Sequence, residues 1–294
     1  MKIRTFLIAL VLLTIVFCLT LIIFPECDSD SPISDNGRML SCRFYDDKSF
    51  KTSLSTSEVI PLPSNKIYGG IVNHHLTADK LIAEFFKSIS ITQPDIVILV
   101  GPNHTGLGVK TVHTSGWSWN TPYGILQADL GITNFLTNNG MADTSFELME
   151  NEHSIATLVP YIKYFMPNTK IVPIILSSSV EKNDAVELGK LLYEEVKDKN
   201  YLVISSVDFS HYLSLAEADK KDLVTKEALL SRDINQISNM NNDYLDSPAS
   251  IILLLTMMNE AGADNQIILN QSNSARILRG DSNSTTSYFV VTYY

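Results

Sequence analysis

The chain has 294 residues, with 22 Lys and Arg against 32 Asp and Glu, which gives a formal net charge of -10. Hydrophobic residues make up 45% of the chain and cysteines number 3, so the composition excludes a disordered chain and a disulfide-built fold. The acidic balance argues against nucleic-acid partners, because binding phosphates requires clustered Lys and Arg. The length suits one large α/β domain or two small ones, with a core built by ordinary packing.

The N-terminal segment has the composition of a membrane anchor. Residues 5–24 contain no charged side chain and follow Lys2 and Arg4. A helix of about 20 apolar residues rises about 30 Å, which matches the hydrocarbon core of a bilayer. Since no small-residue cleavage site follows, residues 1–25 are predicted to be an uncleaved signal anchor and transmembrane helix rather than a cleaved signal peptide. Positive residues stay on the cytoplasmic side, so the domain is expected to be membrane-anchored and extracytoplasmic.

Residues 26–65 are predicted to form a stalk or linker. They are rich in Asp, Ser, Pro and other turn formers, and they show no apolar period. Cys27 and Cys42 lie in this segment, and they either pair in an oxidising compartment or remain unpaired, because connectivity cannot be derived from sequence. One domain is then expected over residues 66–294.

Within 66–294, apolar runs alternate with segments of helical spacing. The run at 95–104 is continuously apolar, which is typical of a strand buried on both faces. Strands are predicted at 66–75, 95–104, 170–178, 201–211, 266–271 and 287–294. Helices are predicted at 78–89, 126–138, 153–166, 184–198, 215–230 and 247–262. This alternation predicts an α/β fold with a central mixed or mostly parallel sheet and helices on both faces.

Four segments place a histidine in the polar turn beside an apolar run. They contain His74 with His75, His104, His153, and Asp208 with His211. Ligands of open α/β sheets bind beyond the carboxyl ends of the strands, so these segments are expected to meet at one edge. Imidazole is the commonest metal ligand and titrates near neutral pH, so the pattern predicts a metal site or an acid–base cluster.

Some of these polar residues also have ordinary structural explanations. Asn151 and Glu152 suit the cap of the helix that His153 begins and the dipole of that helix. Asp208 is expected either to orient His211 or to cap the following turn. His113, which lies outside the four segments, is expected at the surface.

The motifs GPNH (101–104), NTPYG (120–124), NEHSI (151–155) and SVDFSHY (206–212) resemble those of the Memo family, the AmmeMemoRadiSam system protein B group. That family is similar in fold to the class III extradiol ring-cleaving dioxygenases. The resemblance runs in order from about residue 66 to the C-terminus. It implies a central sheet with helices on both sides and a mononuclear metal, with iron or copper expected first.

The resemblance also implies the positions of a site. His74 and His104 fall on the metal-ligating histidines of the family. Asp208, His211 and His153 fall on positions that line the same pocket and would be catalytic, with His211 as the general acid/base beside the metal.

The third ligand departs from the family pattern. Many members carry a cysteine before a late helix, and the dioxygenases carry a glutamate; here this position falls near Tyr244, a poor ligand for most divalent ions. Asp243 or Asp246 would complete a two-His-one-carboxylate set. Oxygen in place of sulfur shifts the preference from copper toward iron, manganese or zinc. Trp117 and Trp119 are expected either in the core or rim, or as an apolar mouth over the pocket.

Three functions are compatible with this pattern. The first is a metal-dependent oxidoreductase, dioxygenase-like, that acts on a small molecule. The second is a non-catalytic domain that binds a small-molecule or peptide ligand in the same pocket. The third is a metal chelator at the membrane surface. A dry apolar mouth favours the enzyme, and a wide polar opening favours the chelator.

Overall fold

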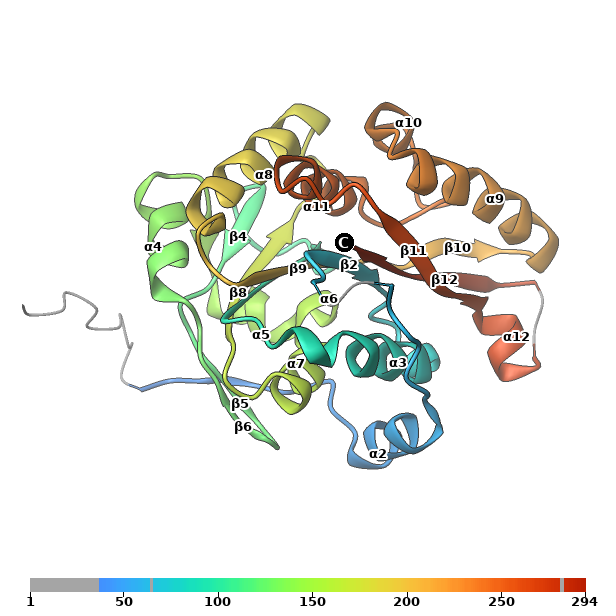
Figure 1. The fold of residues 1–294 in the computed structure, drawn as a ribbon, viewed down its shortest axis with the longest axis horizontal. Coiled ribbons are helices and arrows are strands. Elements are labelled where there is room, and N and C mark those ends of the chain that lie inside the picture. The colour runs from blue at the N-terminus through green and yellow to red at the C-terminus, as the bar shows by residue number, and fades with distance from the viewer. Residues whose placement is uncertain (1–36, 64–65, 281–282) are drawn as a thin grey trace, which may run out of the picture. The chain divides into compact units, whose positions relative to one another are not determined.

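A mixed β-sheet forms the centre of the fold (Figure 1). The structure, a computed structural model, describes residues 37–63, 66–280 and 283–294. Within these residues the sheet comprises β2 (Gly69–Val72), β3 (Ile96–Pro102), β4 (Val112–Thr114), β7 (Asp143–Thr144), β8 (Lys170–Leu176), β9 (Tyr201–Ser206), β10 (Phe209–Leu213), β11 (Gln266–Asn273) and β12 (Thr285–Tyr293). Their order across the sheet is β10, β12, β2, β9, β3, β8, β4 and β7, and β11 pairs with β12.

The central strands β2, β9, β3 and β8 run parallel to one another. On either side, β12 joins β2 and β4 joins β8 in antiparallel fashion. Each apolar run predicted as a strand overlaps one, and the run at 201–211 overlaps both β9 and β10. The prediction of an α/β fold with a mixed sheet is therefore confirmed. The parallel centre matters for function, because it brings the carboxyl ends of β2, β9 and β3 to one edge.

Helices cover both faces of the sheet (Figure 1). One face carries α4 (Leu130–Asn138), α8 (Lys182–Val196), α9 (Leu215–Ser231), α10 (Ile234–Ser238) and α11 (Pro248–Glu260). The other face carries α2 (Asp47–Thr56), α3 (Asp79–Ile89), α5 (Phe146–Asn151), α6 (His153–Ala156) and α7 (Val159–Phe165). Short connections are made by η1 (Leu76–Ala78), η2 (Ser90–Thr92) and α12 (Ser274–Leu278).

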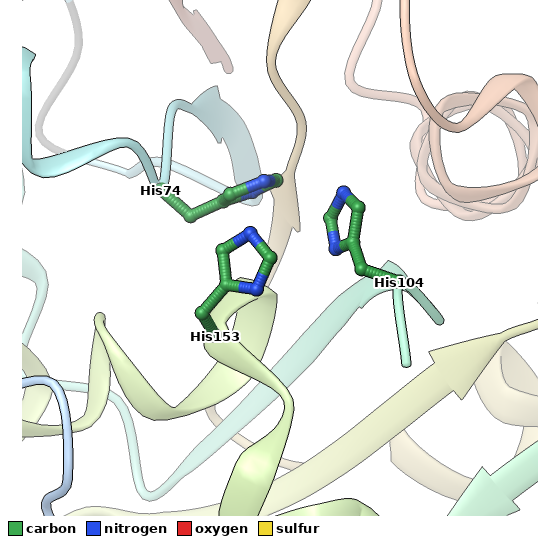
Figure 2. A group of neighbouring side chains, drawn as sticks. All are labelled: His74, His104 and His153. Atoms are coloured by element: carbon green, nitrogen blue, oxygen red, sulfur yellow. The ribbon is translucent and has the colours of Figure 1, made fainter. Parts of the chain in front are cut away.

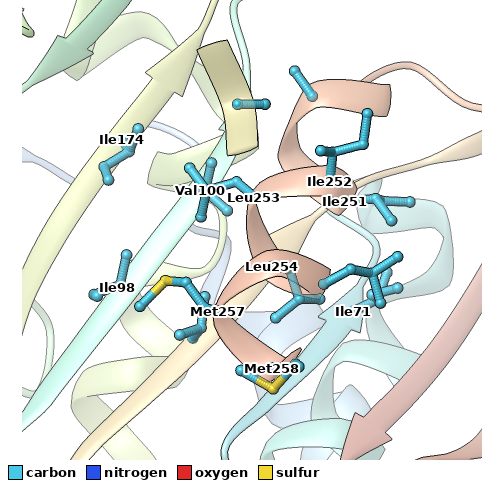
Figure 3. Packing of buried hydrophobic residues seen from close by; sticks show 14 of the residues in the cluster. Ile71, Ile98, Val100, Ile174, Ile251, Ile252, Leu253, Leu254, Met257 and Met258 are labelled. Atoms are coloured by element: carbon cyan, nitrogen blue, oxygen red, sulfur yellow. The ribbon is translucent and has the colours of Figure 1, made fainter. Parts of the chain in front are cut away.

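Strand β3 shows why both faces are covered. Ile98 and Val100 belong to the hydrophobic cluster under α8 and α11, whereas Val97 and Leu99 belong to the cluster under α3 and α7. Successive side chains of a strand point to opposite faces, so a continuous apolar run needs partners on both. Figure 3 shows α11 lying on the first of these faces, with its side chains directed at the strands.

Helix α11 is itself buried on all sides. Its segment SIILLLTMM (250–258) has no charged residue, and each of these side chains is buried. A helix that is apolar all round needs a buried position, and α11 has one because it packs on β2, β9 and β3 and against α8 and α10.

The predicted transmembrane helix has to be corrected. Among the residues that the structure describes, no helix is long and apolar enough to cross a membrane. The longest of them, α9, has 17 residues and carries several charged side chains, whereas a span needs about 20 apolar residues. The predicted anchor at 1–25 lies outside the described residues, as does Cys27. The membrane-anchored, extracytoplasmic placement depended on that helix and is corrected with it.

The predicted linker contains strand structure where none was expected. A second, three-stranded sheet consists of β1 (Leu40–Ser41), β5 (Trp119–Thr121) and β6 (Gly124–Leu126). β1 pairs in parallel with β5, and the Leu40 side chain is buried in the domain core. Cys42 follows directly and is a half-buried free thiol.

Helix α2 also lies within the segment predicted as a linker. The Asp46 carboxylate accepts a hydrogen bond from the Ser49 backbone N–H and caps the first turn. Phe50 of α2 is buried with its ring centroid 4.5 Å from that of Tyr161. The described part of residues 26–65 therefore packs on the domain, which begins before residue 66.

Candidate metal centre

Three histidines from separate loops meet beyond the carboxyl ends of the parallel strands (Figure 2). His74 follows β2, His104 follows β3, and His153 begins α6. One ring nitrogen of each histidine lies within 4.8 Å of those of the other two. The topology therefore gathers these three imidazoles at the edge where the sequence pattern places a site.

Gly101 allows α6 to approach β3 closely. A Cβ atom at this position would lie 2.8 Å from Ser154 Oγ and 2.9 Å from Ser154 Cβ, so a larger residue would displace the helix. The Ser154 hydroxyl donates a hydrogen bond to the Pro102 carbonyl (2.7 Å). This close approach leaves the ring of His153 stacked on that of His104, with 4.3 Å between centroids.

The buried carboxylate of Glu152 orients His104. Glu152 Oε2 accepts a hydrogen bond from the His104 backbone N–H (2.7 Å), and Oε1 lies 2.9 Å from His104 Nδ1. These bonds and that from the Ser154 N–H lower the pKa of Glu152 to about 2, although burial alone would raise it. Because the carboxylate is ionised, His104 Nδ1 carries a proton and Nε2 faces the cluster. The helix-cap function expected for Glu152 is also present, in its bond with Ser154.

His74 is held in a comparable way. Its Nδ1 lies 3.1 Å from the Ser206 hydroxyl oxygen, and its backbone N–H donates to Asp208 Oδ1 (3.1 Å). The imidazole is buried, and its Nε2 lies 3.6 Å from Asp208 Oδ2. Asp208 therefore supports His74 rather than orienting His211, for which no hydrogen bond with Asp208 is present among the described residues.

Asp246 is the group that joins the two histidines. Its Oδ2 lies 3.3 Å from His74 Nε2 and 3.5 Å from His104 Nε2. A charge-assisted hydrogen bond would be shorter, about 2.7–2.9 Å. Two ligands that each lie about 2.1 Å from one ion are about 3.0 Å apart at a right angle and about 3.4 Å apart at a tetrahedral angle. The observed distances of 3.3 and 3.5 Å are close to these spacings. Oδ1 of the same carboxylate is also buried without a hydrogen-bond partner. This set of donor atoms therefore fits a metal ion.

The protonation of the histidines in the cluster is also compatible with a divalent ion that binds in place of their protons. Burial lowers the pKa of His74, but Asp208 and Asp246 outweigh it and raise that pKa. Burial also lowers the pKa of His104, but Asp246 and Glu152 outweigh it and raise that pKa to about 10. The pKa of Asp246 stays low, because the imidazoles outweigh its burial. For His153, burial and the neighbouring imidazoles lower the pKa to about 4. A divalent ion that displaces protons from the two cationic histidines would preserve the local charge.

Comparison with known proteins identifies the family of this chain. The profile of the family described as Memo-like protein matches residues 53–292. The chain belongs to this family. A MEMO1 family protein of Aquifex aeolicus is 29% identical over 218 residues, which is 73% of this chain and 80% of the relative. A MEMO1 family protein of Methanobrevibacter smithii is 31% identical over 202 residues, which is 66% of this chain and 71% of the relative. An uncharacterized protein of Escherichia coli K12, known from a crystal structure, aligns with a TM-score of 0.49 and 12% identity over 77% of this chain and 99% of that one.

Asp243 and Asp246, the two aspartates predicted as alternatives for a third ligand, have different surroundings. Asp243 is 44% exposed and lies 3.4 Å from Lys221 Nζ. Tyr244 packs on the hydrophobic cluster, with Lys221 Nζ 4.2 Å from its ring centroid. Asp246 alone of the two aspartates reaches the histidines, because its N–H donates to the Asp208 carbonyl (3.1 Å) and fixes the loop there.

His211 lies on β10 beside this group. Its backbone N–H donates to the Asn242 carbonyl (3.1 Å), and its Nδ1 is buried without a hydrogen-bond partner. Burial lowers the pKa of His211, so the ring is held neutral and is able to accept a proton. His75, next to His74, is exposed and its Nδ1 lies 2.7 Å from the Tyr288 hydroxyl, away from the cluster.

The predictions for His113 and the two tryptophans have different outcomes. His113 is buried on β4, with its Nε2 2.8 Å from the Lys110 carbonyl, so the surface position expected for it is wrong. Trp119 is fully buried in the core, and Trp117 packs on Phe146 with 5.3 Å between centroids. Neither tryptophan lines the cavity beside the histidines, so the alternative of a core or rim position applies.

A cavity of about 700 Å³ opens beside His104 and Asp246. His104 and Asp246 are part of its lining, and the other polar groups are neutral amides and hydroxyls, including those of Asn103, Asn242 and Ser177. No Lys or Arg is part of this lining, and apolar side chains form the rest of the wall. The size suits a small organic ligand, and the lining other than His104 and Asp246 offers it uncharged hydrogen-bonding groups.

Proposed function

We propose that the chain is a metal-dependent oxidoreductase, dioxygenase-like, with one divalent ion bound by His74, His104 and Asp246. The observation that carries this proposal is the position of Asp246 Oδ2, 3.3 and 3.5 Å from the Nε2 atoms of the two histidines. His153 offers a further nitrogen within the same cluster. Two histidines and one carboxylate are the ligand set of many oxygen-using non-haem iron enzymes.

The donor set favours iron among the candidate metals. All donors of the described cluster are nitrogen or oxygen, and Tyr244 stands near the position where many family members have a cysteine. Copper loses its preferred sulfur ligand, so iron(II) is proposed first, with manganese and zinc as competitors. Bound at this position, the metal would supply a Lewis acid with open coordination positions for substrate and dioxygen.

The chain itself would supply orientation and a proton acceptor. Glu152 and Ser206 fix the rings of His104 and His74 so that both Nε2 atoms face Asp246. The neutral imidazole of His211 is proposed to take a proton from a substrate hydroxyl. The substrate would lie in the 700 Å³ cavity, next to His104 and Asp246 and in contact with the amides and hydroxyls of the remaining wall.

The experiment is oxygen uptake by the full-length chain after anaerobic loading with iron(II), with a panel of uncharged catechol-like compounds. His211→Gln is the informative variant, because it should retain the ion and lose turnover. Turnover by the parent that falls at least about 100-fold in this variant supports the proposal. An iron-loaded chain without oxygen uptake on any compound would contradict an enzyme and leave ligand binding or chelation.

A further inference from the structure

The segment before the family match reaches the metal centre. The match begins at residue 53, and Phe44 lies before it with its ring centroid 5.9 Å from that of His153. We propose that Phe44 is a positioning residue of the metal centre, which holds the imidazole of His153 against His104 and shields it from solvent. This inference rests on the proposed metal site.

The chain on the N-terminal side of Phe44 is tied to the turn that carries His153. Arg43 Nη2 lies 3.0 Å from Glu150 Oε2, and its Nη1 donates to Asn151 Oδ1 (3.0 Å). The Ser41 hydroxyl donates to Glu150 Oε1 (2.8 Å). The pairing of β1 with β5 also fixes this segment to the domain. Residues 150 and 151 directly precede Glu152 and His153, so the segment is bound to the same turn that it covers.

A second attachment follows Phe44. The Tyr45 and Tyr123 hydroxyl oxygens lie 3.0 Å apart and share a hydrogen bond. Asp46 caps α2, and Phe50 of that helix is buried in the core. Since both sides of Phe44 are fixed to the domain, its ring has a defined position beside His153.

The side chain of His153 depends on ring packing for its orientation. Among the described residues, its ring contacts are with Phe44 (5.9 Å), His74 (5.1 Å) and His104 (4.3 Å between centroids). Its Nδ1 lies 3.4 Å from Glu152 Oε1, which is long for a charge-assisted hydrogen bond. The side chain is also 39% exposed. Without Phe44, the imidazole would be free to rotate toward solvent and away from the cluster.

The test uses Co²⁺ as the probe on the metal-free full-length chain, with affinity and the visible d–d spectrum as readouts. Phe44→Ala should weaken Co²⁺ binding about tenfold and alter the spectrum, because His153 leaves its position. Phe44→Tyr, which keeps the ring, should restore both. Phe44→Leu, which keeps apolar volume without a ring, should resemble Phe44→Ala and covers the case in which the alanine variant folds poorly.

Lys51→Ala is the matched control, because Lys51 is an exposed residue of the same segment paired only with Asp47 among the described residues. It should leave affinity and spectrum unchanged. Parent-like Co²⁺ affinity and spectrum in both Phe44→Ala and Phe44→Leu would overturn the inference about Phe44 but not the proposed metal site. Absence of Co²⁺ binding by the unaltered chain would overturn the proposed metal site and this inference with it.

Discussion

Replacement of Asp246 by Asn tests the assignment of the third ligand. The side chain keeps its shape, but the anionic oxygen 3.3 and 3.5 Å from the two Nε2 atoms is lost. Removing partners that merely orient metal ligands costs about 10–100-fold in affinity, so loss of a direct anionic ligand should cost at least about 100-fold. At about 1.4 kcal/mol per factor of ten, this is about 2.8 kcal/mol of binding free energy.

Asp243→Asn provides the matched control for Asp246→Asn. Asp243 lies three residues away in sequence, is 44% exposed and pairs with Lys221, so its replacement should change metal affinity less than about twofold. The assay is competition for Co²⁺ or Fe²⁺ against a chromophoric chelator, on metal-free chains whose folding is checked by circular dichroism. Equal losses in the two variants, or parent-like affinity of Asp246→Asn, would refute the assignment of Asp246.

Three further predictions follow from the site. Glu152→Gln should lower metal affinity about 10–100-fold in the same competition assay, because the amide no longer fixes the tautomer of His104; an affinity within twofold of the parent would contradict this. The pKa of His104 is raised to about 10, so in the metal-free chain its contribution to stability should be complete below about pH 6.5 and lost as pH rises toward 10. Over the same range metal affinity should rise with pH as proton competition weakens, and thermal melts with metal titrations at pH 6 to 9 measure both; an affinity independent of pH would exclude proton displacement. Gly101→Ala should destabilise the fold by about 1–3 kcal/mol in urea unfolding, because its Cβ would lie 2.8 Å from Ser154 Oγ; an unchanged midpoint would show that α6 can shift without cost.

Much of the fold could be predicted from the sequence, because the hydrophobic pattern of each segment agrees with its burial in the structure. The run at 95–104 is apolar at every strand position, and β3 is covered on both faces. The apolar segment 247–262 contains α11, whose residues 249–258 are all buried. His74 and His104 could be placed together for a similar reason, since each follows a parallel strand whose end lies at the same edge.

The remaining features depend on contacts between distant segments. Asp246 reaches the histidines only because its loop hydrogen-bonds to Asp208, 38 positions earlier, and nothing local separates it from Asp243. Glu152 has the appearance of a helix cap, and its second bond to His104 depends on tertiary structure. Helix α2 has only Phe50 and Ser53 buried, so its apolar pattern is too sparse to predict a helix that packs on the domain.

The most direct test of the metal site is elemental mass spectrometry of the full-length chain, purified without a metal-binding tag. The parent and a His74→Ala/His104→Ala double variant would be loaded with iron(II) and freed of excess metal. The site predicts close to one ion per chain in the parent and almost none in the double variant, since both Nε2 atoms that face Asp246 are removed. Equal metal content in the two proteins, or none in the parent after loading, would contradict it.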